Sequence, residues 1–254
     1  MLLAIDVSNT TIKVGVFDGD RLVSHFRFAT DRGRQADEYA MLMLSLFREH
    51  AIERAAISGV VMSCVVPPLR GVFRDACERY LGAAPVIVSH EGRTGIVLDV
   101  EHPREVGADR IANALAIHRL HGGPAIGIAF GTATVFDCLS ADGRYLGGAI
   151  APGMVTALES LASRAAQLFQ IALEIPDRAI GRNTVSTMQS GVVLGFAGLV
   201  EGLVTRLSRE LGGTPKVVAT GGLAEVVAPA TTVIHVIDPH LTLRGLSLYH
   251  AENR

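Results

Sequence analysis

A short run of small polar residues, Ser8 to Thr11, lies between two apolar segments near the N-terminus. Tight turns of this kind present main-chain N–H groups and short hydroxyl or amide side chains that can hold phosphate oxygens. Asp6 directly precedes the run, where a carboxylate could serve a hydrated magnesium ion that bridges nucleotide phosphates. Lys13 follows it and adds a positive charge. An ordinary Asx-containing hairpin turn explains the same residues, because no GxxxxGK[ST] loop and no GxGxxG opening a helix occurs in the chain.

A second turn with the same chemistry is Gly131-Thr132-Ala133-Thr134. Two such turns could hold a triphosphate from opposite sides. A third candidate is Gly107-Ala108-Asp109-Arg110, at the predicted start of a helix. There Asp109 could accept a proton from a hydroxyl, and Arg110 could fix an anionic group by a forked contact. A carboxylate that favours the helix start beside a solvated arginine is the alternative.

Other polar residues favour structural roles. His118 and His121 are three residues apart, but no nearby carboxylate completes a metal site. Ser63 and Ser190 lack the setting of a nucleophile elbow. The run Thr220-Gly221-Gly222 would allow a flat ligand such as a nucleobase to approach the backbone, although a plain strand-to-helix turn explains it equally well.

The elements that must position these residues alternate between strands and helices, which favours an α/β fold. Strands are predicted at 2–7, 11–17, 21–28, 56–64, 85–89, 216–220 and 232–237, and helices at 37–49, 69–81, 105–118, 154–169 and 184–211, with a last segment at 241–250. The opening three-stranded meander recurs over 125–149, about 120 residues later, with 5–11 aligned on 128–134. This repeat predicts two similar halves with a cleft between them. The alternative is that hairpins with Asp-Gly turns simply look alike.

Composition restricts the class of protein. Of 254 residues, 49% are hydrophobic and 19% charged, which excludes an intrinsically disordered chain. The formal net charge of −2 gives no global positive field for nucleic acid or an anionic membrane. We therefore expect neither partner, and the longest uncharged stretches fall short of the ~20 apolar residues of a membrane span. Three widely spaced cysteines and an N-terminus unlike a secretory leader predict a cytoplasmic protein.

Taken together, the motifs resemble those of the type III pantothenate kinases, in the superfamily of acetate kinase, sugar kinases and actin. The resemblance spans nearly the whole chain and is carried by ordered blocks: IDVSNTTIKVGVFDG, MSCVVPPL, HPREVGADRIANAL, FGTATVFD, GGAIAPGM, IGRNTVSTMQSG, GFAGLVEGLV, VATGGLA and DPHLTLRGL. It implies an α/β fold of two tandem ribonuclease H-like lobes, with mixed five-stranded sheets flanked by helices and a cleft between the lobes. The lobes would be residues 1–115 and 116–254.

The resemblance also implies an activity, namely ATP-dependent phosphorylation of pantothenate to 4'-phosphopantothenate, the first step of coenzyme A biosynthesis, in a homodimer with its active site near the interface. Asp109 would be the general base and Asp6 would serve magnesium through water. Thr184 would reach pantothenate across the dimer interface. The remaining implied contacts are Val7, Ser8, Asn9, Thr10, Thr11, Ile12, Lys13 and Thr132 for ATP, and Val100, Gly107, Ala108 and Arg110 for pantothenate.

Three positions depart from the family pattern. Ala129 stands where the family has an aspartate for a monovalent cation such as potassium or ammonium. Ser8 replaces a glycine, and Val100 lies where some members have a tyrosine. A methyl group cannot coordinate a cation, so the alternative to an active kinase is a catalytically impaired paralogue with a binding or regulatory role.

Overall fold

The computed structural model describes residues 1–254, which divide into two compact units. Unit 1 comprises residues 1–97, 101–116 and 241–254, and unit 2 comprises residues 98–100 and 117–240. Unit 1 is followed by unit 2 after residue 116. The C-terminal segment, however, belongs to unit 1 and not to the second half of the chain. The reason is that its helix packs on strands of the first sheet.

The sheet of unit 1 has five strands in the order β3-β2-β1-β4-β5. Their bounds are β1 Leu2–Val7, β2 Thr11–Asp18, β3 Arg21–Ala29, β4 Gly59–Cys64 and β5 Pro85–Ile87. β1 pairs antiparallel with β2 and parallel with β4, so it lies at the centre of a mixed sheet. The predicted three-stranded meander is confirmed. The predicted strand at 56–64 begins only at Gly59, because Arg54–Ala56 form a 3₁₀ turn.

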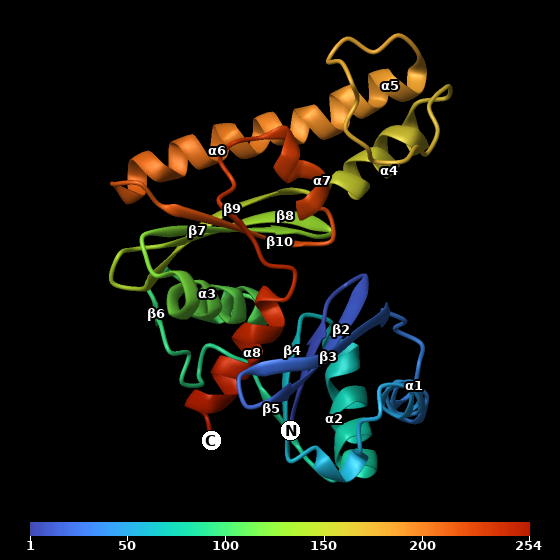
Figure 1. The fold of residues 1–254 in the computed structure, drawn as a ribbon, viewed down its shortest axis with the longest axis vertical. Coiled ribbons are helices and arrows are strands. Elements are labelled where there is room, and N and C mark those ends of the chain that lie inside the picture. The colour runs from blue at the N-terminus through green and yellow to red at the C-terminus, as the bar shows by residue number, and fades with distance from the viewer. The chain divides into compact units, whose positions relative to one another are not determined.

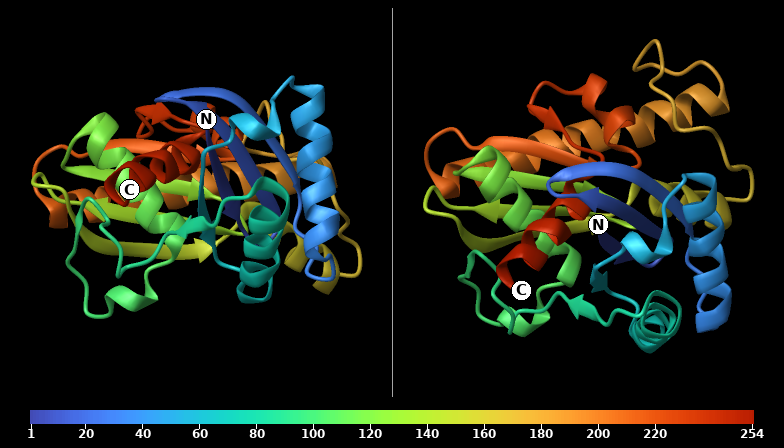
Figure 2. Two further views of the ribbon diagram at one scale, coloured as in Figure 1. Left: turned by 90° about the horizontal axis from the view of Figure 1, so that it is seen from below. Right: turned by 60° about the horizontal axis from the view of Figure 1, so that its bottom comes forward.

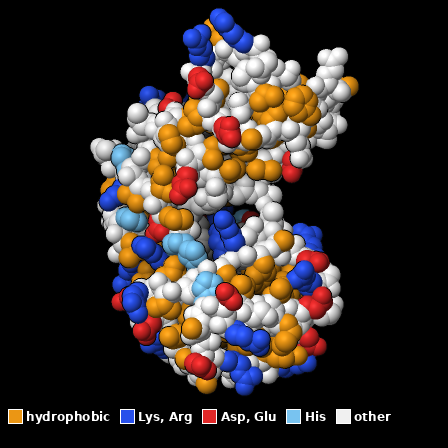
Figure 3. Space-filling view, turned by 45° about the vertical axis from the view of Figure 1, so that its right-hand side comes forward, with side chains coloured by type: hydrophobic (Ala, Val, Ile, Leu, Met, Phe, Trp, Pro, Cys, Tyr) orange, Lys and Arg blue, Asp and Glu red, His pale blue; other side chains and the backbone are white.

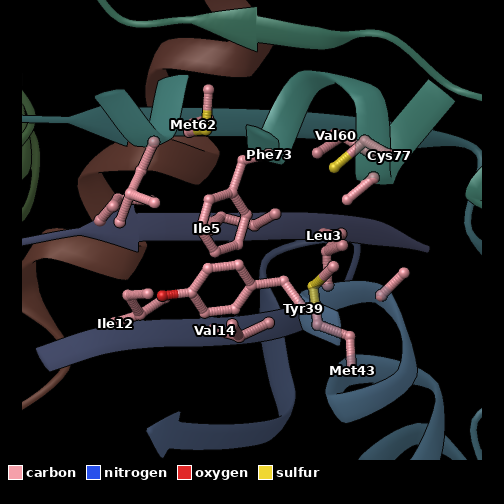
Figure 4. Close-up of a cluster of buried hydrophobic side chains, with 14 of the residues drawn as sticks. Leu3, Ile5, Ile12, Val14, Tyr39, Met43, Val60, Met62, Phe73 and Cys77 are labelled. Carbon is pink, nitrogen blue, oxygen red and sulfur yellow. The ribbon is translucent and has the colours of Figure 1, made fainter. Parts of the chain in front are cut away.

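Helices cover both faces of this sheet (Figures 1 and 2). They are α1 Ala36–Glu49 and α2 Pro67–Leu81 on one face and α8 Leu241–Glu252 on the other. Unit 1 also contains a 3₁₀ turn at Pro103–Glu105 and the first part of α3 Ala108–His121, where the Ala112 carbonyl packs closely against Gly245 of α8. Because side chains alternate along a strand, Leu3 and Ile5 of β1 face α1 and α2, where they pack with Tyr39 and Phe73 (Figure 4). The opposite face, which carries Asp6, is the face that α8 covers.

The sheet of unit 2 has six strands, in the order β11-β10-β7-β8-β9-β6. Their bounds are β6 Val97–Leu98, β7 Ala125–Phe130, β8 Ala133–Leu139, β9 Arg144–Pro152, β10 Lys216–Gly221 and β11 Val236–Ile237. Five strands were predicted per sheet, and the sixth is the short edge strand β6. Predicted strand 232–237 shortens to its last two residues.

One face of this sheet packs on helices from the second half of the chain. They are α4 Met154–Arg164, α5 Thr184–Gln189, α6 Gly195–Leu211 and the short α7 Ala224–Val227, followed by a 3₁₀ turn at Ala228–Ala230. The single helix predicted over 184–211 is continuous, but residues Ser190–Leu194 form a π-helical turn within it. The helix predicted over 154–169 ends at Arg164. On the other face, the end of the Ile117 side chain of α3 packs closely against Gly127.

The two sheets repeat one arrangement, which confirms the duplication predicted from the sequence. In each, a central strand pairs antiparallel with the second strand of a meander and parallel with a later strand. Asp6 of β1 lies opposite Lys13 on one side and Ser63 on the other. At the same position of the second sheet, Ala129 of β7 lies opposite Val135 and Thr220. The repeat therefore makes Ala129 the counterpart of Asp6.

Candidate active site

Asp6 is the most enclosed charged group among the candidate site residues, with 1% of its surface exposed. Its Oδ1 atom accepts a hydrogen bond of 2.6 Å from the Ser63 hydroxyl, and its Oδ2 atom accepts one of 3.1 Å from the Ser8 hydroxyl. The Lys13 ammonium lies 3.6 Å from Oδ2. A buried carboxylate needs such partners, because burial without them would strongly disfavour its charge.

The turn after β1 is held from outside by the end of β3. The Thr30 hydroxyl donates to the Ser8 carbonyl at 2.7 Å, and the Thr30 N–H donates to the Thr10 carbonyl at 3.0 Å. Arg32 donates to the Asn9 side chain at 3.3 Å. Asn9 and Thr10 themselves are exposed. The turn is thus fixed in shape while its outer surface is open to a ligand, as phosphate binding by main-chain groups requires.

The remaining residues expected to bind ATP in this segment divide by strand alternation. Val7 and Ile12 are fully buried in the core of unit 1, so only their main-chain atoms could meet a ligand. Thr11 and Lys13 are half-buried on the other face of β2. Because of this alternation, the side chain of Lys13 lies on the same face as the Asp6 carboxylate and close to it.

Gly107 directly precedes α3, and Ala108 to Arg110 lie in its first turn, near the predicted helix start; all four residues are half-buried. The Asp109 Oδ1 atom accepts from the Arg110 N–H at 3.0 Å, which orients the carboxylate along the first helical turn. A Cβ atom at position 107 would lie 2.7 Å from that same oxygen. A glycine is therefore needed at position 107 if the carboxylate is to keep this orientation.

The second turn, Gly131 and Thr132, is exposed and lies at the end of β7 in unit 2. Its shape is set by the start of α4, because the Gly153 N–H and the Thr156 hydroxyl both donate to the Thr132 carbonyl, at 3.0 and 2.9 Å. A side chain at Gly153 would collide with the carbonyl oxygens of Gly131 and Thr132. Val100, expected near pantothenate, lies beside Gly147 of β9 in unit 2.

Position 129 offers no side-chain oxygen to a monovalent cation. Ala129 is half-buried and offers only a methyl group. Thr220, its neighbour on β10, is 2% exposed, and its hydroxyl has no hydrogen-bond partner. In unit 1 the equivalent hydroxyl, that of Ser63, bonds the carboxylate of Asp6. The unpaired Thr220 hydroxyl is thus what remains when the carboxylate of such a pair is missing.

Replacing Ala129 by aspartate is expected to supply that missing partner. The cost of burying a carboxylate there should be smaller by about 1.5–3 kcal/mol when Thr220 is present than in a Thr220→Val background, because a hydrogen bond to a charged group has that strength. Urea unfolding of the native chain, both single variants and the double variant measures this coupling. Additive effects would show that the two side chains do not meet.

Thr184 is the first residue of α5 and is exposed. The Asn183 side chain caps this helix by accepting from the Ser186 N–H at 2.9 Å. Thr184 lines an apolar pocket of about 690 Å³ in unit 2, together with Leu161, Leu168, Met188 and Phe196. The residue thus lies at the edge of an apolar surface, and it belongs to a different unit from Asp109.

The structure adds residues that sequence reasoning missed. The sequence predicts no part for Ser63 beyond its lack of a nucleophile setting, whereas its hydroxyl bonds Asp6. No role is predicted for Thr30, whose hydroxyl holds the first turn. A polar residue in an apolar strand was the available signal for Ser63. The cysteines are buried and form no disulfide, and burial raises the pKa of the Cys77 thiol to about 12. No group of three or more His, Cys, Asp or Glu residues could hold a metal ion.

Comparison with known proteins shows the family of the chain. The model of the family described as type III pantothenate kinase matches residues 2–206. A type III pantothenate kinase of Roseiflexus sp. (strain RS-1) is 52% identical over 254 residues, covering all of both chains.

Solved structures share the fold. A Baf family protein from Campylobacter jejuni superposes with a TM-score of 0.62 at 17% identity, covering 98% of each chain. The inorganic polyphosphate/ATP-glucomannokinase of Arthrobacter sp. strain KM superposes with a TM-score of 0.54 at 16% identity, again covering 98% of each chain. The duplicated sheets and the order of the motifs agree with the full-length match, and the chain belongs to the type III pantothenate kinase family.

Proposed function

We propose that the protein transfers the γ-phosphoryl group of ATP to the primary hydroxyl of pantothenate, giving 4'-phosphopantothenate and ADP in the first step of coenzyme A biosynthesis. The observation that carries the proposal is the 52% identity to a type III pantothenate kinase over the whole of both chains. Asp6, Asp109 and Arg110 supply the chemistry that this reaction needs, since phosphoryl transfer depends mainly on positioning and charge stabilisation.

In the proposed reaction, Asp109 accepts the proton of the substrate hydroxyl while the hydroxyl oxygen bonds to the γ-phosphorus. The bond between that phosphorus and the β,γ-bridging oxygen breaks, and its electron pair leaves with ADP. Arg110 holds the pantothenate carboxylate by a forked contact. Main-chain N–H groups of the first turn and the side chain of Lys13 hold phosphate oxygens, and Thr132 gives a second phosphate contact.

The residues at the first turn fit a magnesium ion that travels with ATP. Magnesium keeps several of its waters and is held by one or two carboxylates together with substrate phosphates. Asp6 provides one such carboxylate and would hold the ion through water. The ion, when bound, neutralises the charge of the phosphates. No step is assigned to a monovalent cation, because Ala129 does not fit one.

We further propose that two copies associate through the end of unit 2 that carries α4 and α5, with Thr184 reaching the partner's substrate. Apolar side chains gather there, around the pocket next to Thr184 (Figure 3, upper part). Among them, Phe169 is 51% exposed and Ile180 is 83% exposed. Exposed apolar surface of this kind marks an interaction site.

The helical stretch Thr184–Leu211 is long and apolar enough to cross a membrane by length and composition alone. A buried helix of a globular protein passes the same test. We assign the apolar face of this stretch to the proposed dimer and place the enzyme in the cytoplasm, without a nucleic-acid or membrane partner.

Turnover is expected without potassium or ammonium. The test is ADP release from MgATP, with and without pantothenate and with and without 100 mM potassium or ammonium chloride, on protein whose oligomeric state is measured by light scattering. Pantothenate-dependent ADP release that changes less than about twofold with the cation supports the proposal. Absence of turnover under all conditions would favour the catalytically impaired paralogue, especially if Ala129→Asp restored potassium-dependent turnover.

A further inference from the structure

Ser63 is a fully buried hydroxyl whose one hydrogen bond goes to a charged group. It is 0% exposed, and it donates to Oδ1 of Asp6 at 2.6 Å. The two residues are 57 positions apart in the chain, and they meet because β1 and β4 pair in parallel with Asp6 opposite Ser63. A hydroxyl-to-carboxylate distance in this range is typical of a charge-assisted hydrogen bond.

The partners of the Asp6 carboxylate differ between its two oxygens. Oδ1 is bonded by Ser63, which lies on the neighbouring strand and is enclosed by the sheet. Oδ2 is bonded by Ser8 and lies near Lys13, and both of these residues are partly exposed beside the first turn. The bond from Ser63 to Oδ1 and the bond from Ser8 to Oδ2 together fix the carboxylate, with Oδ2 on the side of the first turn.

In the second sheet, two strands pair without a hydrogen bond from the hydroxyl at this position. Thr220 occupies the position of Ser63, opposite Ala129, and its buried hydroxyl has no partner. The strands β7 and β10 nevertheless pair along six consecutive residues. Pairing of two strands at this position therefore does not require a hydrogen bond from the hydroxyl, and the feature that distinguishes Ser63 is its bond to the Asp6 carboxylate.

We propose that Ser63 is a positioning residue for Asp6, which fixes Oδ1 so that Oδ2 faces the bound magnesium–phosphate group. That this group is magnesium bound with the phosphates of ATP rests on the proposed function. Loss of an outer-shell group at a metal site typically lowers metal affinity by about 10–100-fold. Ser63 should therefore matter for ATP bound with magnesium and not for ATP alone.

The experiment is calorimetric titration of the full-length protein with ATP, in 5 mM magnesium chloride and in EDTA, without pantothenate so that no phosphoryl acceptor is present. In the native chain, magnesium should strengthen ATP binding. In Ser63→Ala, that strengthening should fall by about 10–100-fold, with the affinity in EDTA changed less than about threefold. Ser63→Thr keeps a hydroxyl and should restore most of the magnesium effect.

Thr94→Val is the matched control. Thr94 is a buried hydroxyl of unit 1, 9% exposed, which donates to the Ile96 carbonyl and not to a carboxylate. Its loss should leave the magnesium effect unchanged. If Ser63→Ala does not fold, as judged by circular dichroism, Ser63→Cys keeps the bulk with a weaker donor and should lose the same effect.

Two results would overturn the inference: a magnesium effect in Ser63→Ala equal to that of the native chain, or an equal loss in Thr94→Val. Absence of any magnesium effect in the native chain would also overturn it. Failure of the proposed function is a separate outcome, since a chain that binds MgATP but releases no ADP with pantothenate still tests Ser63.

Discussion

Asp109→Asn is expected to lower kcat for pantothenate phosphorylation by about 10²–10⁴-fold, the usual contribution of a positioned general base. Asparagine has the same shape and can still accept the Arg110 N–H, so the start of α3 should be preserved. What it lacks is an oxygen that takes up the proton of the hydroxyl. Steady-state ADP release across pantothenate concentrations measures the effect, with KM changing less than kcat.

Asp37→Asn is the control for the alternative role of Asp109. Asp37 also lies in the first turn of a helix of unit 1, α1, but it is an exposed residue paired with Arg79 and Tyr80. A carboxylate that only favours a helix start contributes about 0.3–1 kcal/mol to stability. If Asp109→Asn behaved like Asp37→Asn, with a small loss of stability and an unchanged kcat, Asp109 would not be the base.

Asp6→Asn is expected to reduce turnover at low magnesium concentration by about 10²-fold, the upper end of the loss seen when an outer-shell group of a metal site is removed. The amide keeps the shape of the side chain but not its charge, so Lys13 is left without its anion and a metal-bound water without its acceptor. Raising magnesium should recover part of the lost rate. ADP release measured against magnesium concentration tests this.

Asp18→Asn serves as the control for Asp6, because Asp18 is an exposed carboxylate at the end of β2, paired only loosely with Arg21 at 3.9 Å. Its magnesium dependence should equal that of the native chain. A magnesium dependence in Asp6→Asn indistinguishable from that of Asp18→Asn would remove Asp6 from the metal site.

Local patterns predicted most of the elements and the two candidate turns. The apolar run of 2–7 and the Val, Ile and Thr residues of 11–17 placed the first hairpin within one residue of its observed ends, because strand composition and turn residues are read from neighbouring positions. Helix ends were predicted less well. The helix expected over 105–118 runs from Ala108 to His121, since residues 103–105 form a separate 3₁₀ turn.

The sequence by itself determined the duplicated meander, the turn after Asp6 and the helix start that carries Asp109, and it showed that Ala129 lacks a carboxylate. Only the tertiary structure decided that Ser63 bonds Asp6, that Thr220 is left without a partner and that α8 joins unit 1. These three facts depend on which strands and helices become neighbours across more than fifty residues of chain. Sheet pairing and packing are set by long-range contacts, whereas periodicity and turn composition report only the conformation of adjacent residues.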